Sequence, residues 1–182
     1  MSRGSASFGV MASRERDAVD RIISEWNAVR PDLDVEPIAV IGRISRVSRL
    51  IDRRLAENFA SFGIESWMYD VLATLRRSGA PYELAAGDLV RHTMVTTGAV
   101  TNRIDRLEAR GLVARASADD RRKVMVRLTA EGLRLVDDIV ESHLEVEREI
   151  LSVLTDRNRQ ELARLLSATL MALGDTATPG SD

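Results

Sequence analysis

The chain has 182 residues and a mass of 20.1 kDa, which suffices for one well-buried domain with appended helices but not for two independent catalytic domains. Its 45% hydrophobic and 30% charged residues can build a core, and the lack of cysteine excludes disulfides, thiolate metal sites and thiol redox sensing. Two histidines are too few for a histidine-built metal centre, and no apolar run is long enough for a membrane span. We expect a soluble, cytoplasmic protein with no cofactor, no metal and no membrane partner.

The net charge of −2 conceals an uneven distribution along the chain. Residues 91–127 hold nine basic and four acidic side chains, whereas residues 128–182 hold five basic and eleven acidic ones. Attraction to a polyanion depends on nearby charge, because salt screens distant charge. The basic block therefore favours nucleic acid as a partner, although scattered solvated charges would give the same count.

The N-terminal third is predicted to be helical. Residues 1–12 are small, polar and without periodicity, so we expect a flexible arm or leader. A helix is predicted from Ser13, its cap, to the residue before Pro31. After a linker over residues 31–37, a longer helix ends at Gly63. Its apolar stripe, opposite an arginine-rich face, consists of Val40, Ile44, Val47, Ile51, Leu55 and Phe59.

The middle of the chain combines short helices with a hairpin. Three helices are predicted, over about residues 66–78 with Ser66 as cap, 85–91 and 95–109. A turn at residues 92–93 separates the last two. Residues 112–116 and 123–128 alternate with period two and predict a hairpin with an exposed tip at 117–122. Two helices joined by a tight turn and followed by a ribbon are typical of a winged helix-turn-helix, which reads DNA.

Two long helices are predicted near the C-terminus, over residues 130–151 and 156–173, with Thr129 and Thr155 as caps. The outer helices carry apolar stripes that so small a central module does not cover. We therefore expect a homodimer built from both termini, with a monomeric helical bundle as the alternative.

The predicted fold class is mainly α with a small β-hairpin wing. The predicted domains are the arm (1–12), an added helix with a dimerisation helix (13–60), the winged helix-turn-helix (61–129), C-terminal dimerisation helices (130–174) and a flexible tail (175–182).

The helix over residues 95–109 is the candidate recognition helix. At about 100° per residue, Val100, Ile104 and Leu107 share one face, which is predicted to be core. Small polar side chains on the opposite face allow close approach to a major groove, and Asn102 has the groups for a paired contact with adenine. The same residue types are also ordinary on a solvated helix. The DNA-binding candidates on this helix, beside Asp105, are Thr96, Thr97, Gly98, Thr101, Asn102 and Arg106.

The hairpin tip adds further candidates. Arg121, Arg122 and Lys123 follow one another, and arginine on a ribbon suits a narrow minor groove. The preceding Asp120 would repel phosphate, unless it holds an arginine in an extended conformation through a charge-assisted bond. The alternative is a polar hairpin that only keeps the protein soluble.

Several runs along the chain carry a family resemblance: Gly63-Ile64, residues 70–76, residues 98–112, Asp119-Asp-Arg-Arg122 and residues 126–132. Together they resemble the MarR-type family of bacterial transcriptional regulators over residues 37–173. The resemblance implies a triangular dimer with interlocked terminal helices and two winged helices that read a pseudo-palindrome. The family's Asp-x-Arg wing pattern falls on Asp120 and Arg122. This implies that Arg122 enters the minor groove and that Arg121 contacts phosphate.

The added N-terminal helix makes the chain similar to the urate-responsive subgroup of that family. The resemblance implies an effector site at four positions whose residue types match: Trp26, Asp70, Arg103 and Arg115. An arginine of the recognition helix that turns away from the groove needs an internal carboxylate partner, and Asp70 is the candidate. A planar anion would pair with both arginines and stack near Trp26, and moving Arg103 would move the helix that reads DNA. The alternatives are a dimer-core role for Trp26 and a structural ion pair for Asp70.

The sequence thus predicts a dimeric winged-helix repressor that a small anionic metabolite releases from double-stranded DNA. Urate or a related purine is the first candidate effector, a tricarboxylate such as trans-aconitate or citrate the second, and a phenolic ligand the third. A ligand-indifferent architectural DNA-binding or protein-binding module is a different function class. An enzyme is not expected, because no convergent acid–base or nucleophile set is present.

Overall fold

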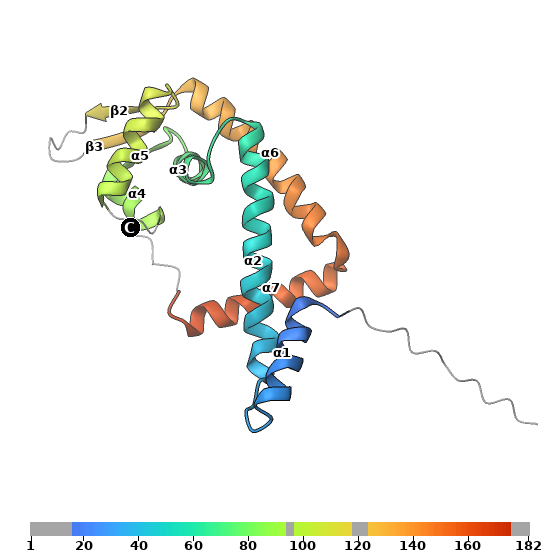
Figure 1. The fold of residues 1–182 in the computed structure, drawn as a ribbon. Coiled ribbons are helices and arrows are strands. Elements are labelled where there is room, and N and C mark those ends of the chain that lie inside the picture. Colours follow the sequence, from blue (N-terminus) through green and yellow to red (C-terminus); the bar gives the residue numbers. More distant parts are fainter. Residues whose placement is uncertain (1–15, 94–96, 118–123, 176–182) are drawn as a thin grey trace, which may run out of the picture. The chain divides into compact units, whose positions relative to one another are not determined.

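A computed structural model describes residues 16–93, 97–117 and 124–175, which are mostly helical (Figure 1). The chain divides into two compact units, residues 1–51 and 52–182. Within the described residues, no helix has the length and apolar character to cross a membrane. The elements in chain order are α1 (Ala18–Val29), α2 (Glu36–Ser61), α3 (Ser66–Arg77), β1 (Glu83–Ala85), α4 (Ala86–Thr93), α5 (Thr97–Ala109), β2 (Val113–Ser117), β3 (Val124–Leu128), α6 (Ala130–Ile150), the 3-10 turn η1 (Leu151–Val153) and α7 (Asp156–Ala172). The predicted fold class is confirmed.

The start of α1 is fixed by Asp17. Its carboxylate accepts hydrogen bonds from the backbone N–H groups of Val19 and Asp20, at 2.7 and 3.1 Å, and Asp20 completes a capping box. The predicted cap, Ser13, lies outside the described residues, and the helix begins instead at Ala18. The acidic side chain at position 17 satisfies backbone donors that would otherwise have no partner.

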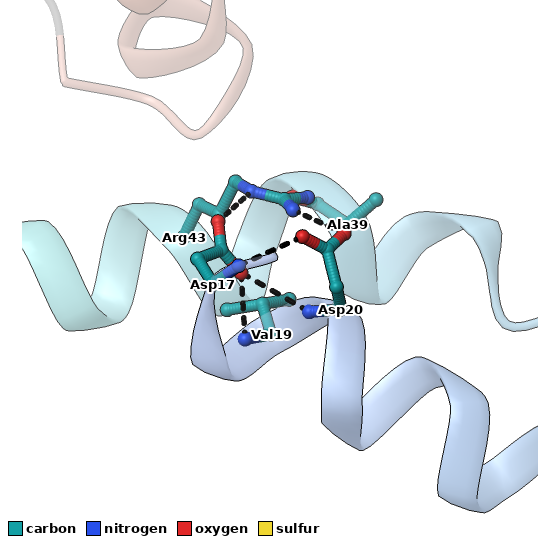
Figure 2. A network of polar contacts seen from close by, with 5 residues as sticks. All are labelled: Asp17, Val19, Asp20, Ala39 and Arg43. Atoms are coloured by element: carbon teal, nitrogen blue, oxygen red, sulfur yellow. Dashed lines mark hydrogen bonds and ion pairs between the residues drawn. The ribbon is translucent and has the colours of Figure 1, made fainter. Parts of the chain in front are cut away.

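In the first unit, α1 packs on the N-terminal half of α2. Val19 is buried against Gly42, where an added Cβ would lie only 3.2 Å from the Val19 side chain. Figure 2 shows the Arg43 guanidinium bonded to two carboxylates, Asp17 at 2.8 Å and Asp20 at 2.7 Å. The bond from Arg43 lowers the pKa of Asp17. One arginine of α2 therefore holds the first turn of α1 in place.

The second unit contains a three-stranded antiparallel sheet in the order β1-β3-β2. Val126 of the central strand β3 pairs with Arg115 of β2 and with Leu84 of β1. The β2–β3 pair is the predicted hairpin. Strand β1 was not predicted, because three residues are too few to display alternation, and Ala85 belongs to it rather than to the next helix. The turn predicted at residues 92–93 is wrong, because α4 continues through Thr93.

The core of the second unit fixes how α5 is turned. Val100, Ile104 and Leu107 are each at most 2% exposed, as their spacing predicts. They pack in one cluster with apolar residues from α3, α4, the sheet and α6, which include Leu72, Leu75, Leu89, Val126 and Ile139. Because α5 buries this stripe, its opposite face is directed to solvent.

Of the caps predicted for α3, α6 and α7, the last two are confirmed and the first is wrong. Thr129 and Thr155 cap α6 and α7, each by accepting a hydrogen bond from the backbone N–H three residues later, as predicted. Ser66 is not the cap of α3, because it already lies in the helix and Glu65 occupies the cap position. The Glu65 carboxylate accepts the indole N–H of Trp67 rather than a backbone N–H.

A close approach between α6 and the start of β2 gives a stability prediction. A Cβ at Gly132 would lie 2.0 Å from the backbone oxygen of Leu112, so any side chain there forces the two segments apart. We expect Gly132→Ala to lower the free energy of unfolding by about 1–3 kcal/mol, the usual cost of overpacking. Urea denaturation followed by circular dichroism, at one fixed protein concentration, measures this change.

Gly87→Ala on α4 is the matched control, because nothing lies within 4 Å of the added Cβ. This variant should gain about 0.4–1 kcal/mol, since alanine restricts the unfolded chain. Equal stability of the two variants would contradict the close approach at Gly132.

Candidate nucleic-acid interface and effector site

The polar face of α5 carries the described part of the predicted DNA-binding surface. Thr101, Asn102 and Arg106 are exposed, and Asp105 beside them is exposed as well. The side chains of Thr97 and Gly98 are not among those that the structure describes. Four further candidates lie outside the described residues: Thr96, Asp120, Arg121 and Arg122.

Arg106 contacts α3. Its guanidinium forms an ion pair with the Glu65 carboxylate and lies over the ring of Trp67, with 4.7 Å between the guanidinium carbon and the ring centroid. The indole N–H of Trp67 donates to the same carboxylate at 2.9 Å. These bonds, first from Trp67 and then from Arg106, lower the pKa of Glu65. The guanidinium of Arg106 is therefore held by Glu65 and Trp67 in this structure.

Arg103 lies on the same flank of α5, three residues before Arg106. It is half-buried, and its guanidinium carbon lies 5.5 Å from the centroid of the same Trp67 ring. The charge of Arg103 acts on Asp70, which stands three residues after Trp67 on α3. Arg103 thus contacts an aromatic ring and is near enough to an acidic side chain to affect its pKa.

Asp70 is in an environment that disfavours its charge. Burial raises the pKa of Asp70, and the nearby guanidiniums of Arg103 and Arg77 only partly oppose that effect. The residue as a whole is exposed, so this burial is partial. No hydrogen bond or ion pair joins the carboxylates and guanidiniums of Asp70 and Arg103 among the described residues. Their interaction is therefore through space.

Arg115 has different partners. From β2, its guanidinium pairs with the carboxylates of Asp105 and Glu108, and its backbone N–H donates to Glu108 at 3.1 Å. Hydrogen bonding to Asp105 is the main cause that raises the pKa of Arg115. The mean direction of Asp105 and Glu108 lies about 160° around α5 from the mean direction of Arg103 and Arg106, given 100° per residue. Arg115 therefore joins the wing to the opposite flank of the helix.

The four predicted effector residues are thus distributed unevenly. Asp70 and Arg103 interact, Arg115 is paired on the other flank, and Trp26 lies on α1 in the first unit with 44% of its surface exposed. Trp67 is a candidate that the sequence reasoning missed. Its position three residues before Asp70 could have indicated Trp67, because that spacing places both side chains on one face of a helix.

The MarR family model matches residues 62–123, which run from the end of α2 to the wing. The HTH-type transcriptional regulator PecS of Dickeya dadantii (strain 3937) is 44% identical over 149 residues, which are 81% of this chain and 90% of PecS. The chain belongs to the MarR family. It is a DNA-binding transcriptional regulator, and members of this family are not enzymes.

Two solved structures show the same fold as this MarR-family regulator. A mutant of MarR from E. coli, complexed with operator DNA, has a TM-score of 0.65 and 26% identity, and the match covers 80% of this chain and 97% of that one. BpsR of Bordetella bronchiseptica, whose DNA binding is regulated by 6-hydroxynicotinic acid, has a TM-score of 0.62 and 26% identity over 71% of this chain and 93% of that one.

The raised pKa of Asp70 predicts a pH-dependent effect on stability. The folded chain holds this proton more tightly than the unfolded chain, so the charged carboxylate lowers the free energy of unfolding at neutral pH. We expect Asp70→Asn to melt at a higher temperature than the parent at pH 7. The difference should shrink as the pH falls through the raised pKa towards the ordinary value of 3.8, because the parent is then protonated too.

Thermal melts from pH 7.5 to 4.5 measure this difference. Asp138→Asn on α6 provides the control, because Asp138 is exposed. A melting temperature for Asp70→Asn at or below that of the parent at pH 7 would contradict the desolvation of Asp70.

Proposed function

We propose that this MarR-family regulator is a homodimeric repressor that a small planar anion, first of all urate or a related purine, releases from a pseudo-palindromic operator. The observation that carries the proposal is Arg103. This arginine is half-buried on the candidate recognition helix, over the Trp67 ring and within electrostatic reach of the carboxyl group of Asp70. A cation in that position serves the interior of the protein rather than the DNA groove, and an anion is its natural ligand.

The DNA-binding part of the proposal rests on α5 and the wing. Thr101 and Asn102 are exposed polar residues on the face of α5 away from the core, and Asn102 suits paired recognition of adenine. Arg121 and Arg122 at the hairpin tip would contact phosphate and the minor groove, respectively. The structure of MarR from E. coli with operator DNA supports this mode of binding, because the fold is shared.

The homodimer is proposed from the apolar surface of the terminal helices. In the single chain, α7 exposes apolar side chains at helical spacing, Leu162, Leu165, Leu166 and Leu170, and the first half of α2 does the same with Val40, Ile44 and Val47. Monomeric proteins rarely leave such stripes uncovered. Because homodimers are typical of the family, a second copy of this chain is the partner that fits.

The effector is proposed from the charge and shape that Arg103 and its neighbours would accept. A planar anion would pair with the guanidinium and stack on an aromatic ring, while its charge would oppose that of Asp70. BpsR is regulated by 6-hydroxynicotinic acid, which is a planar aromatic acid and supports this class of ligand. A tricarboxylate such as citrate offers charge without a ring, and a phenol offers a ring with little charge, so they rank second and third.

Two further residues complete the proposed effector site. Trp26 would contribute a second aromatic surface, and Arg115 a second guanidinium. In this structure Arg115 is paired with Asp105 and Glu108 on the flank of α5 opposite Arg103, so an anion shared by both arginines would have to displace these carboxylates. Such an exchange would leave Asp105 uncompensated on the face proposed to meet DNA, which would weaken binding to phosphate.

Arg122→Ala should weaken binding to the DNA upstream of the protein's own gene by about 1–3 kcal/mol, or roughly 5- to 150-fold in Kd. The physical reason is the loss of one arginine from a minor groove. Fluorescence anisotropy at several salt concentrations measures this effect, and the parent should lose affinity steeply with salt because counterions are released.

Arg134→Ala on α6 is the control, because Arg134 is exposed and lies outside the proposed surface. Sedimentation should find two copies per particle for the parent and both variants. Dissociation of the Arg122→Ala dimer would show that residue 122 has a structural role instead.

Urate should raise the Kd of the parent for this DNA by about 5- to 150-fold, the usual range of allosteric coupling. Arg103→Gln should bring that ratio close to one, because the neutral amide does not bind the anion. Arg115→Ala should reduce the urate response more than it reduces DNA binding. Parallel titrations with citrate and with phenol, which is uncharged at neutral pH, rank the three ligand classes.

A parent protein that binds DNA but ignores all three ligands would be the ligand-indifferent module, and the effector proposal would fail. A urate response that survives Arg103→Gln would place the ligand elsewhere.

A further inference from the structure

The ring of Trp67 is shared by two arginines. Arg103 and Arg106 both place their guanidinium carbons over it, at 5.5 and 4.7 Å from its centroid. The ring of Tyr82 provides a comparison, because within the described part of the chain Arg76 alone places its guanidinium carbon over it, at 4.9 Å from the centroid. The indole of Trp67 thus contacts both the arginine proposed for the effector and an arginine proposed for DNA.

The acidic residues beside Trp67 match the two arginines one to one. Glu65 pairs with Arg106 and also accepts the indole N–H, while Asp70 lies within electrostatic reach of Arg103. Glu65 and Asp70 lie on either side of Trp67 at the start of α3. The N-terminal part of α3, with its cap residue Glu65, therefore presents one ring and two carboxyl groups to two guanidiniums of α5.

We infer that Trp67 is a positioning residue that couples the effector arginine, Arg103, to the DNA-facing arginine, Arg106. The inference rests on the proposed function and goes beyond it by assigning the route between the two sites. Like charges on a common ring repel each other, so a guanidinium that leaves the ring makes the contact more favourable for the one that stays. An anion that draws Arg103 away strengthens the hold of Trp67 and Glu65 on Arg106.

This arrangement links release from DNA to one side chain. To reach a phosphate, Arg106 has to leave Glu65 and part of the Trp67 ring. Arg106 leaves more easily while Arg103 also lies over the Trp67 ring, because the two cations repel each other. Arg106 leaves less easily when Arg103 is bound to an anion instead. The effector therefore competes with DNA for Arg106 without touching it. One such cation–π contact corresponds to a change of about 2- to 30-fold in Kd.

The test compares Trp67→Leu with Trp67→Phe in the full-length protein. The readout is the ratio of Kd values for the upstream DNA with and without urate, which a purely structural role would not change. Trp67→Leu removes the ring and should reduce this ratio by about fivefold or more. Trp67→Phe keeps a ring for both cations and should keep the ratio within about twofold of the parent.

Asp137→Asn is the matched control, because it breaks the ion pair with Arg76, whose own ring contact is with Tyr82. This variant should leave the ratio at the parent value. A folded Trp67→Leu variant that releases DNA with urate as the parent does would overturn the inference, even if its DNA affinity alone is lower.

A second variant decides the case in which Trp67→Leu does not fold. Glu65 is exposed, so Glu65→Gln leaves the core intact while it frees Arg106 from its ion pair. DNA binding without urate should tighten, and the urate ratio should fall. If Glu65→Gln has the same Kd without urate and the same urate ratio as the parent, the inference is overturned.

Measurements on the parent and on Arg103→Gln distinguish a failure of the proposed effector from a failure of the coupling through Trp67. If urate does not affect the parent, the proposed effector itself is wrong. If urate acts on the parent and Arg103→Gln abolishes that response, while the Trp67 or Glu65 variants respond as the parent does, only the coupling through Trp67 is wrong.

Discussion

The burial of one apolar stripe on α5 determines the orientation of every other side chain of that helix. Val100, Ile104 and Leu107 are almost completely covered, and they enter a core that also holds residues from α3, the sheet and α6. A rotation of α5 by even a fraction of a turn would expose them at a cost of about 1.5–3 kcal/mol for each fully buried side chain. The polar face and both flanks of α5 are therefore held in fixed directions by packing alone.

The two flanks of α5 are then stabilised by opposite charge arrangements. On one flank, arginines of α5 meet acidic residues and a tryptophan of α3; on the other, Asp105 and Glu108 meet Arg115 of β2. These pairs are largely exposed, so each contributes little to the free energy of unfolding. These pairs instead help to orient α5, because its cations link it to the start of α3 and its anions link it to β2.

Much of the fold could be predicted from the sequence, because helical periodicity and caps are local signals. Thr129 and Thr155 begin their helices as predicted, and the buried stripe of α5 follows from spacing alone. The short strand β1 could not be predicted, because its formation depends on pairing with β3. The site was predicted only in part: the interaction of Asp70 with Arg103 was expected, whereas the pairing of Arg115 depends on how the hairpin meets α5, which no spacing shows.

The contact at Gly132 has a mechanical consequence. Thr129 donates its hydroxyl to the carbonyl of Gly111 at 2.7 Å, and Gly132 lies directly against the carbonyl of Leu112, so the start of α6 is in direct contact with the base of the hairpin. Because backbone meets backbone at this point, a displacement of α6 must carry the start of β2 with it.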